Sequence, residues 1–450
     1  MTETTQWMDV EFANLNLGDV RLNRRAKKII EQFMGKPSAS IPQGCGGWSE
    51  TMATYRFLEN EAVEWRDIMA PHWAQTQSRM TEHPVVLCIQ DTSELNYNGQ
   101  QITGLGPLSY EAQRGMYLHP TYAVTPERLP LGVVDAWMWA REKRGADGVR
   151  PGQKESTRWP EGYERVAEMA AEMPGTRLVY VADREADMIE LMKCARDAGT
   201  PADWLVRAKT NRALPDGAKL WSTTTASEPL GEITFTMGPR GKQKGRKVRQ
   251  QLWAKEVDLP AGRAAMVKVT CIIAREIDTP VGADPVEWRL LTNRSAKTFD
   301  EVVELVEWYC ARWEIEIYFH VLKNACQVES MQLAHIDKIE RALALFMVVA
   351  WRIAFLMRLG RTCPDLDARH FFDPDEIRGA YLLTKQRKPD APPTLNEVVR
   401  LVARVGGFLG RKGDGEPGVK TIWQGLQEVR IAALTLQALR DEGVLRTALV

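Results

Sequence analysis

Two aspartates follow strand-like segments and could share a cation. Residues 84–90 and 177–182 are almost continuously apolar, and Asp91 and Asp183 come directly after them. Such runs are typical of strands buried on both faces, and ligands gather at the carboxyl ends of strands in α/β sheets. If the strands are parallel neighbours, the two carboxylates repel each other, and Mg²⁺, which prefers oxygen ligands, would relieve that repulsion. An aspartate after a strand is also commonly a turn or helix-cap residue.

A third carboxylate, Glu316, lies in a long helix predicted over residues 299–328. At about 100° per residue, it shares a narrow stripe with four other polar residues, Tyr309, Arg312, His320 and Lys323. The adjoining arc is apolar and consists of Trp308, Ala311, Ile315, Phe319 and Leu322. A polar stripe beside a core face is typical of a cleft wall, although a solvated helix face with an Arg312–Glu316 pair would give the same pattern.

An α/β domain with a mixed sheet is expected to position these residues. The segments around the two apolar runs have the expected types: strands at 117–124 and 129–139, helices at 155–173 and 186–198, and a strand at 204–209. This order favours an α/β domain rather than an all-β one. From about 210 to 295 polar and apolar residues alternate, which predicts a β-rich insertion before the long helix.

Two basic clusters lie outside the expected core. The first 70 or so residues have a helical pattern, and their cluster consists of Arg21, Arg24, Arg25, Lys27 and Lys28. The second cluster has glycines between its members, which indicates a flexible hairpin tip, and consists of Arg240, Lys242, Lys244, Arg246, Lys247 and Arg249. Each cluster could contact the phosphates of a nucleic acid. The alternative is a solvated surface without a partner, which the dense charge of the second cluster makes the weaker interpretation there.

The overall composition restricts the class of protein only loosely. The 59 basic residues are balanced by 59 acidic ones, so net charge gives no support for a nucleic-acid partner. Seven scattered cysteines without metal-binding spacing favour a reduced, cytoplasmic setting. We expect no secretory signal at the N-terminus. No membrane span is expected either, because the longest apolar run, residues 342–356, is too short and contains Arg352.

Five segments in order resemble one known family. The spacing of Tyr309, Arg312, Glu316 and Lys323 matches the YREK signature of Tn-five-type cut-and-paste transposases, within the IS-four family. Residues 89–93 and 181–187 resemble the segments that carry the family's first and second catalytic aspartates. Residues 17–21 resemble its N-terminal DNA-binding region, and 406–408 with Trp423 resemble its C-terminal region. Ile317 departs from the family, which has a second acidic residue at that position; this removes an outer charge and not a ligand.

The resemblance implies a ribonuclease-H-like catalytic core with mixed sheet and β insertion, flanked by helical domains. Residues 1–70 would bind DNA, 71–362 would form the catalytic domain, and 363–450 would dimerise and contact DNA. Asp91, Asp183 and Glu316 would be the DDE ligands of two Mg²⁺ ions, for which Mn²⁺ would substitute. Tyr309, Arg312 and Lys323 would contact the DNA backbone near the cut.

The resemblance also implies a mechanism and partners. A flipped base would stack on Trp288, assisted by Trp313, although Trp288 could instead be a core residue of a strand. The partners would be the inverted repeats at the transposon ends, target DNA and a second copy of the chain in a synaptic dimer. The protein would act at the nucleoid of a bacterium. Two alternatives remain at this stage: a domesticated descendant that acts as a DNA-binding regulator, and a structure-specific nuclease.

Overall fold

A mixed sheet forms the centre of the protein. The computed structural model describes residues 4–238, 245–262 and 265–444 of the chain. The central strand β1 (Val85–Gln90) pairs in parallel with β6 (Arg177–Ala182), which pairs in parallel with β7 (Asp203–Arg207). On its other side β1 pairs with the antiparallel strand β4 (Arg114–Val124), which also pairs with β5 (Pro130–Trp139). The order β5–β4–β1–β6–β7 confirms the expected ribonuclease-H-like core.

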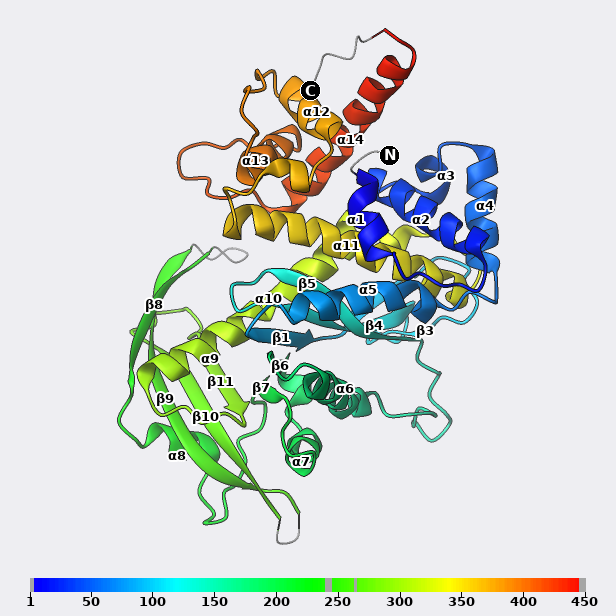
Figure 1. Ribbon diagram of the computed structural model, residues 1–450. Helices are drawn as coiled ribbons and strands as arrows, with labels where there is room; N and C mark the ends of the chain where they lie inside the picture. The colour runs from blue at the N-terminus through cyan, green and yellow to red at the C-terminus, as the bar shows by residue number, and fades with distance from the viewer. Residues whose placement is uncertain (1–3, 239–244, 263–264, 445–450) are drawn as a thin grey trace.

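Helices cover both faces of this core, as Figure 1 shows. On one face, α5 (Trp65–Met80) and α11 (Ile336–Thr362) pack against β5. On the other face lie α6 (Arg158–Glu172) and α7 (Ile189–Asp197). Alternate side chains of β1 join the two corresponding apolar clusters, so the strand is buried on both sides. This burial explains why its sequence is a continuous apolar run.

The expected β-rich insertion continues the same sheet. Its last strand, β11 (Glu287–Thr292), pairs antiparallel with β7, and the sheet then runs outward through β10 (Met266–Ile277), β9 (Arg246–Pro260) and β8 (Gly231–Met237). One short helix, α8 (Leu220–Thr225), packs on β9 and β10. Strand β9 includes Arg246, Lys247 and Arg249, so the expectation that these residues belong to a flexible hairpin tip was wrong.

Helices form both ends of the described chain. The N-terminal ones are α1 (Thr4–Glu11), α2 (Val20–Gly35), α3 (Ile41–Gly44) and α4 (Trp48–Glu59). The C-terminal ones are α12 (Pro374–Leu383), α13 (Leu395–Val405) and α14 (Val419–Asp441). In Figure 1 the two groups lie on the same side of the sheet, against α11. The first expected domain boundary, at residue 70, lies inside α5, and the second lies at the end of α11.

The single helix expected over residues 299–328 is divided, and that prediction was wrong. The structure has α9 (Phe299–Ala311), then α10 (Trp313–His320), then a π-helical segment, Val321–Ala325. At the junction, Arg312 donates its N–H to Tyr309 and accepts from Ile315, and both are short i to i+3 bonds. Such tight turns change the direction of a helix without proline or glycine. Angles calculated for one uniform helix therefore place the stripe only approximately.

Helix α11 is the one helix in the described residues that is long and apolar enough to cross a membrane by length and composition. Of its most apolar 18-residue window, 89% is buried inside the protein. The core helix of a soluble protein passes the same test, and α11 packs against both the sheet and the C-terminal helices.

A buried ionic network connects α1 to α5 at the central sheet. Glu11 is 3% exposed and accepts two hydrogen bonds from Arg79 of α5, at 2.7 and 3.1 Å, and one from His72. The Nε2 atom of His72 accepts the N–H of Val133, so Nδ1 carries the proton donated to Glu11. Burial raises the pKa of Glu11, but His72 and Arg79 outweigh it and hold the pKa at about 2.

We predict that Glu11→Ala lowers the free energy of unfolding by about 3 kcal/mol, because Arg79 loses its buried partner. Because the folded pKa is depressed from 4.5 to about 2, the contribution is complete above pH 4.5 and disappears as the pH falls through 2. Urea unfolding at several pH values measures both effects. The exposed Lys27–Asp9 pair supplies the control: Asp9→Ala should cost less than about 1 kcal/mol, and equal losses for the two variants would contradict the assignment.

Candidate active site

Asp91 and Asp183 lie at adjoining ends of the two central parallel strands. In the register of β1 and β6, Gln90 pairs with Ala182, so each aspartate is the next residue of its strand. The Asp91 carboxylate is only 15% exposed, and its Oδ1 accepts the N–H of Thr92 at 2.8 Å. The structure therefore brings the two carboxylates together as their strand positions predicted.

Asp183 is at the same time a cap. Its Oδ1 accepts the N–H of Glu185 at 2.8 Å at the start of a short 3₁₀ turn, Arg184–Ala186. The cap interpretation and the site interpretation of this residue are thus compatible, because a carboxylate has lone pairs for more than one partner.

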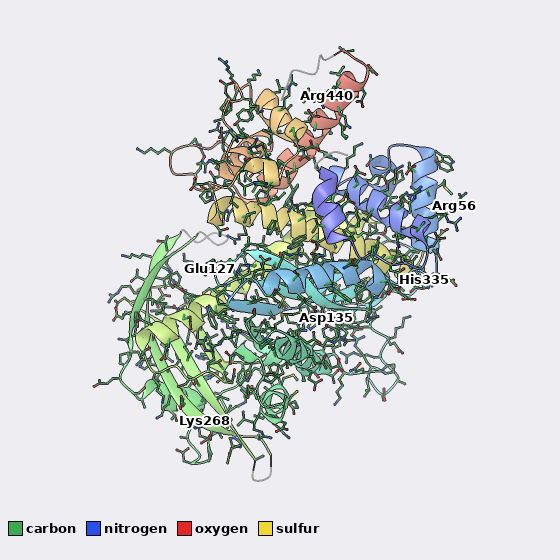
Figure 2. The ribbon with its side chains drawn as sticks, in the orientation of Figure 1. Arg56, Glu127, Asp135, Lys268, His335 and Arg440 are labelled. Atoms are coloured by element: carbon green, nitrogen blue, oxygen red, sulfur yellow. The ribbon has the colours of Figure 1, made fainter. Side chains whose placement is uncertain are left out.

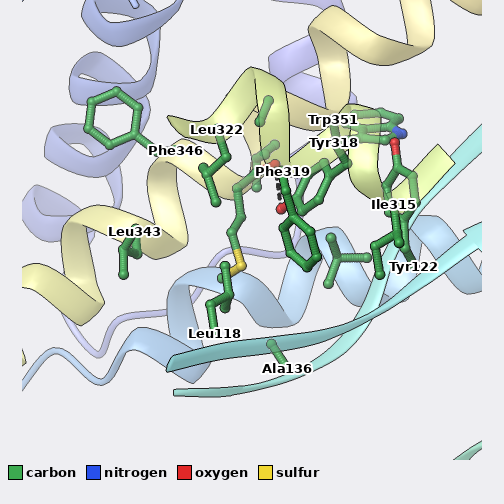
Figure 3. Packing of buried hydrophobic residues seen from close by; sticks show 14 of the residues in the cluster. Leu118, Tyr122, Ala136, Ile315, Tyr318, Phe319, Leu322, Leu343, Phe346 and Trp351 are labelled. Atoms are coloured by element: carbon green, nitrogen blue, oxygen red, sulfur yellow. Dashed lines mark hydrogen bonds between the residues drawn. The ribbon is translucent and has the colours of Figure 1, made fainter. Parts of the chain in front are cut away.

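The position of Glu316 is set by the packing of α10. Ile315, Tyr318 and Phe319 of this helix are buried between the sheet and α11 (Figure 3). Their labelled neighbours in that view are Leu118, Tyr122 and Ala136 of the sheet, and Leu343, Phe346 and Trp351 of α11. On the same helix Glu314 is 2% exposed and forms an ion pair with Arg358 of α11. An apolar face and a buried ion pair therefore fix α10 over the strand ends.

Arg312, at the junction of α9 and α10, connects the third carboxylate to the first. Its Nη1 lies 2.5 Å from Oδ2 of Asp91 and 3.5 Å from Oε1 of Glu316. Arg312 is 8% exposed, so little water screens these contacts. One guanidinium thus stands between two of the three carboxylates.

The charges of the site act on one another. Burial raises the pKa of Asp91 to about 7; Arg312 opposes this shift, whereas Asp183 and Glu316 add to it. All three carboxylates and the arginine are therefore close enough to interact electrostatically. The Arg312 guanidinium thus offsets part of the rise in the pKa of Asp91 that burial and the neighbouring carboxylates cause.

The donor set suits a hard divalent cation, because it consists of carboxylate oxygens only. Among the described residues, however, no group of three or more His, Cys, Asp or Glu side chains lies close enough together to hold a metal ion. At Asp91, Arg312 occupies Oδ2. The residue types fit a metal site. In the present arrangement the positive charge beside Asp91 and Glu316 comes from Arg312.

One other member of the polar stripe, Tyr309, lies within electrostatic reach of Arg312 and Asp183. Tyr309 is 5% exposed, and burial raises its pKa against the influence of Arg312 and Arg207. Lys323 belongs to the π-helical segment and lies 3.8 Å from Glu329. His320, which shares the stripe in the uniform-helix calculation, instead lies against Trp423 of α14.

The two tryptophans expected to contact a base differ in exposure. Trp288 of β11 is half-buried, and its ring stacks on Phe235 of β8 at a centroid distance of 5.6 Å. Trp313 begins α10 and is 50% exposed. One face of Trp288 is therefore covered by a protein ring, as for a residue at the edge of a core.

The basic cluster of α2 is largely paired with carboxylates. Asp19 binds Arg21, Asp9 binds Lys27, and Glu50 binds both Arg25 and Lys28, whereas Arg24 is exposed. In the insertion, Arg240, Lys242 and Lys244 lie outside the described residues. Arg246 forms an ion pair with Glu276 of β10, and Lys247 is exposed in β9. Neither cluster belongs to the carboxylate site.

A basic pocket next to the site was missed by the sequence analysis. It has a volume of about 270 Å³, and its cationic lining residues are Arg184, Arg207, Lys209 and Arg289. Asp187 holds one wall in place by accepting the N–H groups of Lys209 and Thr210 at 2.7 and 2.9 Å. Arg207 ends the third parallel strand and Lys209 follows it, a signal that could have found them. Arg289 gave no signal, because the pairing of β11 with β7 is not predictable from spacing.

Comparison with known families gives three matches in chain order. Residues 4–63 match the family described as transposase DNA-binding, 132–351 match the transposase DDE domain, and 348–440 match the transposase Tn5 dimerisation domain. The DDE match includes Asp183 and Glu316 but begins after Asp91. The role of Asp91 therefore depends on the pairing of β1 with β6.

Among solved structures, the chain is similar to a piggyBac transposase synaptic complex with hairpin DNA. The sequence identity is 9%, the TM-score is 0.38, and the match covers 94% of this chain and 77% of that chain. A likeness at this level supports no inference about the site. The three family matches together extend from residue 4 to residue 440, and the chain belongs to the Tn5-type DDE transposases.

Proposed function

We propose that this transposase carries out cut-and-paste transposition with Asp91, Asp183 and Glu316 as the ligands of two Mg²⁺ ions. The observation that carries the proposal is the link from Glu316 through Arg312 to Asp91, beside the parallel strand end that bears Asp183. Divalent metal use follows from membership of the DDE family. Magnesium is the proposed ion because every donor is a hard oxygen, and Mn²⁺ should replace it.

Paired divalent ions stabilise the attacking and leaving oxygens of an in-line displacement at phosphorus. The protein's own residues must hold the DNA in line. Arg312 is already placed at the carboxylates, and a guanidinium can bind a phosphate through two parallel N–H bonds. We infer that an incoming phosphate draws Arg312 away from Asp91, while Tyr309 and Lys323 bind neighbouring positions of the same strand.

The proposed reaction needs neither a covalent protein intermediate nor ATP. Water first frees a 3′-OH at the transposon end, and this 3′-OH attacks the opposite strand to give a hairpin. A second water opens the hairpin, and the freed 3′-OH attacks target DNA. Each step exchanges one phosphodiester bond for another or hydrolyses one, so a single set of carboxylates suffices.

A hairpin requires a sharply bent strand, and a base that leaves the stack relieves the strain. Trp288 is the proposed platform for that base, because Phe235 covers only one face of the ring. Stacking on an aromatic ring contributes about 1–3 kcal/mol, which is comparable to the cost of unstacking. Exposed Trp313 is proposed to assist from α10.

The remaining DNA contacts and the dimer are also proposals. The cluster of α2 would bind the transposon end, and the basic pocket and the insertion would bind strands near the cut. A bacterial nucleoid is the expected place of action. On α14, Ile431 and Leu434 are about half exposed and one turn apart, and Leu382 of α12 is 55% exposed. These apolar side chains support a dimer through the C-terminal helices, with each site cutting the end held mainly by the other subunit.

We predict that Asp91→Ala, Asp183→Ala and Glu316→Ala each reduce cleavage of end DNA by about 10³-fold or more, because several kcal/mol of charge stabilisation are lost. Binding of the ends should stay nearly unchanged. Glu307→Ala, which removes an exposed carboxylate from α9, is the matched control and should cleave normally. A gel assay in Mg²⁺ separates strand transfer, cutting alone and binding alone, and full cleavage by any one triad variant would exclude that residue.

We also predict that Trp288→Ala slows hairpin formation more than the first nick, since only the hairpin step needs an extruded base. Quenched-flow gels that resolve nicked and hairpin DNA measure the two rates. Trp288→Phe keeps an aromatic face and should recover most of the hairpin rate. Equal slowing of both steps would mean that Trp288 serves only the packing of β11.

For the basic pocket, we predict that Lys209→Ala weakens end binding and reduces the slope of log affinity against log salt by about one, the loss of one phosphate contact. Fluorescence anisotropy at several salt concentrations gives this slope. Lys268→Ala is the control, because Lys268 is an exposed lysine at the far end of the insertion (Figure 2). An unchanged slope for Lys209→Ala would place the pocket outside the DNA path.

A further inference from the structure

A hydrogen-bonded chain runs from Asp91 into the sheet, away from Arg312. Thr92 donates its N–H to Oδ1 of Asp91 at 2.8 Å, and its Oγ1 lies 2.6 Å from Nδ1 of His119 in β4. The chain crosses the gap between β1 and the short strand β2 (Ser93–Asn96), both of which pair with β4.

The strand pairing leaves this gap without regular ladder bonds. Gln90 is the last residue of β1 to pair with β4, and Ser93 is the first residue of β2 to do so. Asp91 and Thr92 fall between these two pairs. The segment that carries the Asp91 carboxylate therefore depends on side-chain bonds for its orientation, and the Thr92–His119 bond is the one that reaches the core.

His119 is held rigidly and is uncharged. It is 1% exposed and lies edge-on to Trp159 at a centroid distance of 4.7 Å and to Trp137 at 5.6 Å. Burial, with a smaller effect of Arg158, lowers the pKa of His119 to about 3. A neutral imidazole bonds a hydroxyl equally well as donor or acceptor, so the link to Thr92 exists in either tautomer.

The ring has a single polar contact in the described part of the chain. Its Nδ1 contacts Thr92, and its buried Nε2 has no hydrogen-bond partner there. Burying a polar ring with one atom unpaired costs free energy that a phenylalanine would avoid. The hydrogen bond to Thr92 is therefore the interaction that a histidine provides at this position and a phenylalanine would not.

We propose that His119 and Thr92 are positioning residues that orient the Asp91 carboxylate for metal binding. On one side Arg312 pulls Oδ2 of Asp91 toward α10. On the other side the Thr92 N–H donates to Oδ1. The hydrogen bond between the Thr92 hydroxyl and His119 keeps Thr92, and therefore its N–H, in position. When Arg312 leaves, the carboxylate keeps its direction. The inference depends on the proposed function in one respect, namely that Asp91 is a metal ligand.

The experiment compares Thr92→Val, which removes the hydroxyl and keeps the shape, with Thr92→Ser, which keeps the hydroxyl. Mn²⁺ binding to the full-length protein on end DNA is measured by electron paramagnetic resonance of free Mn²⁺, alongside cleavage. Outer-shell partners of metal ligands typically contribute about 10–100-fold in affinity. We expect Thr92→Val to weaken Mn²⁺ binding by about tenfold or more, while DNA binding and the thermal midpoint stay near those of the unaltered chain.

Two further variants make the result specific. His119→Asn keeps a polar atom near the place of Nδ1 and should retain much of the affinity, whereas His119→Phe should behave like Thr92→Val. Thr224→Val, which removes another buried hydroxyl, far along the sheet in α8, should change nothing. Mn²⁺ affinity and cleavage that are unchanged in Thr92→Val would overturn the inference. If Asp91→Ala also leaves Mn²⁺ affinity intact, the proposed function fails at Asp91 itself, and the two failures are thereby distinguished.

Discussion

The site depends on the negative charge of Asp91, which is largely buried within electrostatic reach of two other carboxylates, Asp183 and Glu316. Burial is the largest cause that raises the pKa of Asp91 to about 7; Asp183 and Glu316 add to the shift, and Arg312 opposes it. Some positive charge must therefore accompany them. In this structure the charge is Arg312, which contacts both Asp91 and Glu316. A site in which an arginine contacts the proposed metal ligands is suited to exchange, because a DNA phosphate can take the arginine while metal ions take the carboxylates.

The rest of the fold can be understood as the support of this arrangement. Parallel pairing of β1 with β6 sets Asp91 beside Asp183, and the two-sided burial of both strands makes that pairing rigid. Helix α10 brings Glu316 from far along the chain, fastened by its apolar face and by the Glu314–Arg358 pair. The insertion extends the same sheet through β11, so that Trp288 and the basic pocket are attached to the strands that carry the site.

Much of this could be predicted from the sequence, and the remainder depends on long-range pairing. The apolar runs before Asp91 and Asp183 predicted buried strands. The YREK spacing indicated Glu316 as the third carboxylate of the proposed site. The break at Arg312 was not predictable, because neither proline nor glycine marks it. Arg207 and Arg289 meet only because β7 and β11 pair across some 80 residues of chain. His119 looks like an ordinary strand residue until its contact with Thr92 is seen.

A crystal structure of the protein with an end DNA and Mn²⁺, recorded at a wavelength where manganese scatters anomalously, tests the central claim most directly. The account predicts anomalous peaks bounded by Asp91, Asp183 and Glu316, with the Arg312 guanidinium moved onto a DNA phosphate. Peaks elsewhere, or an Arg312 that still binds Asp91 while DNA occupies the site, would contradict it.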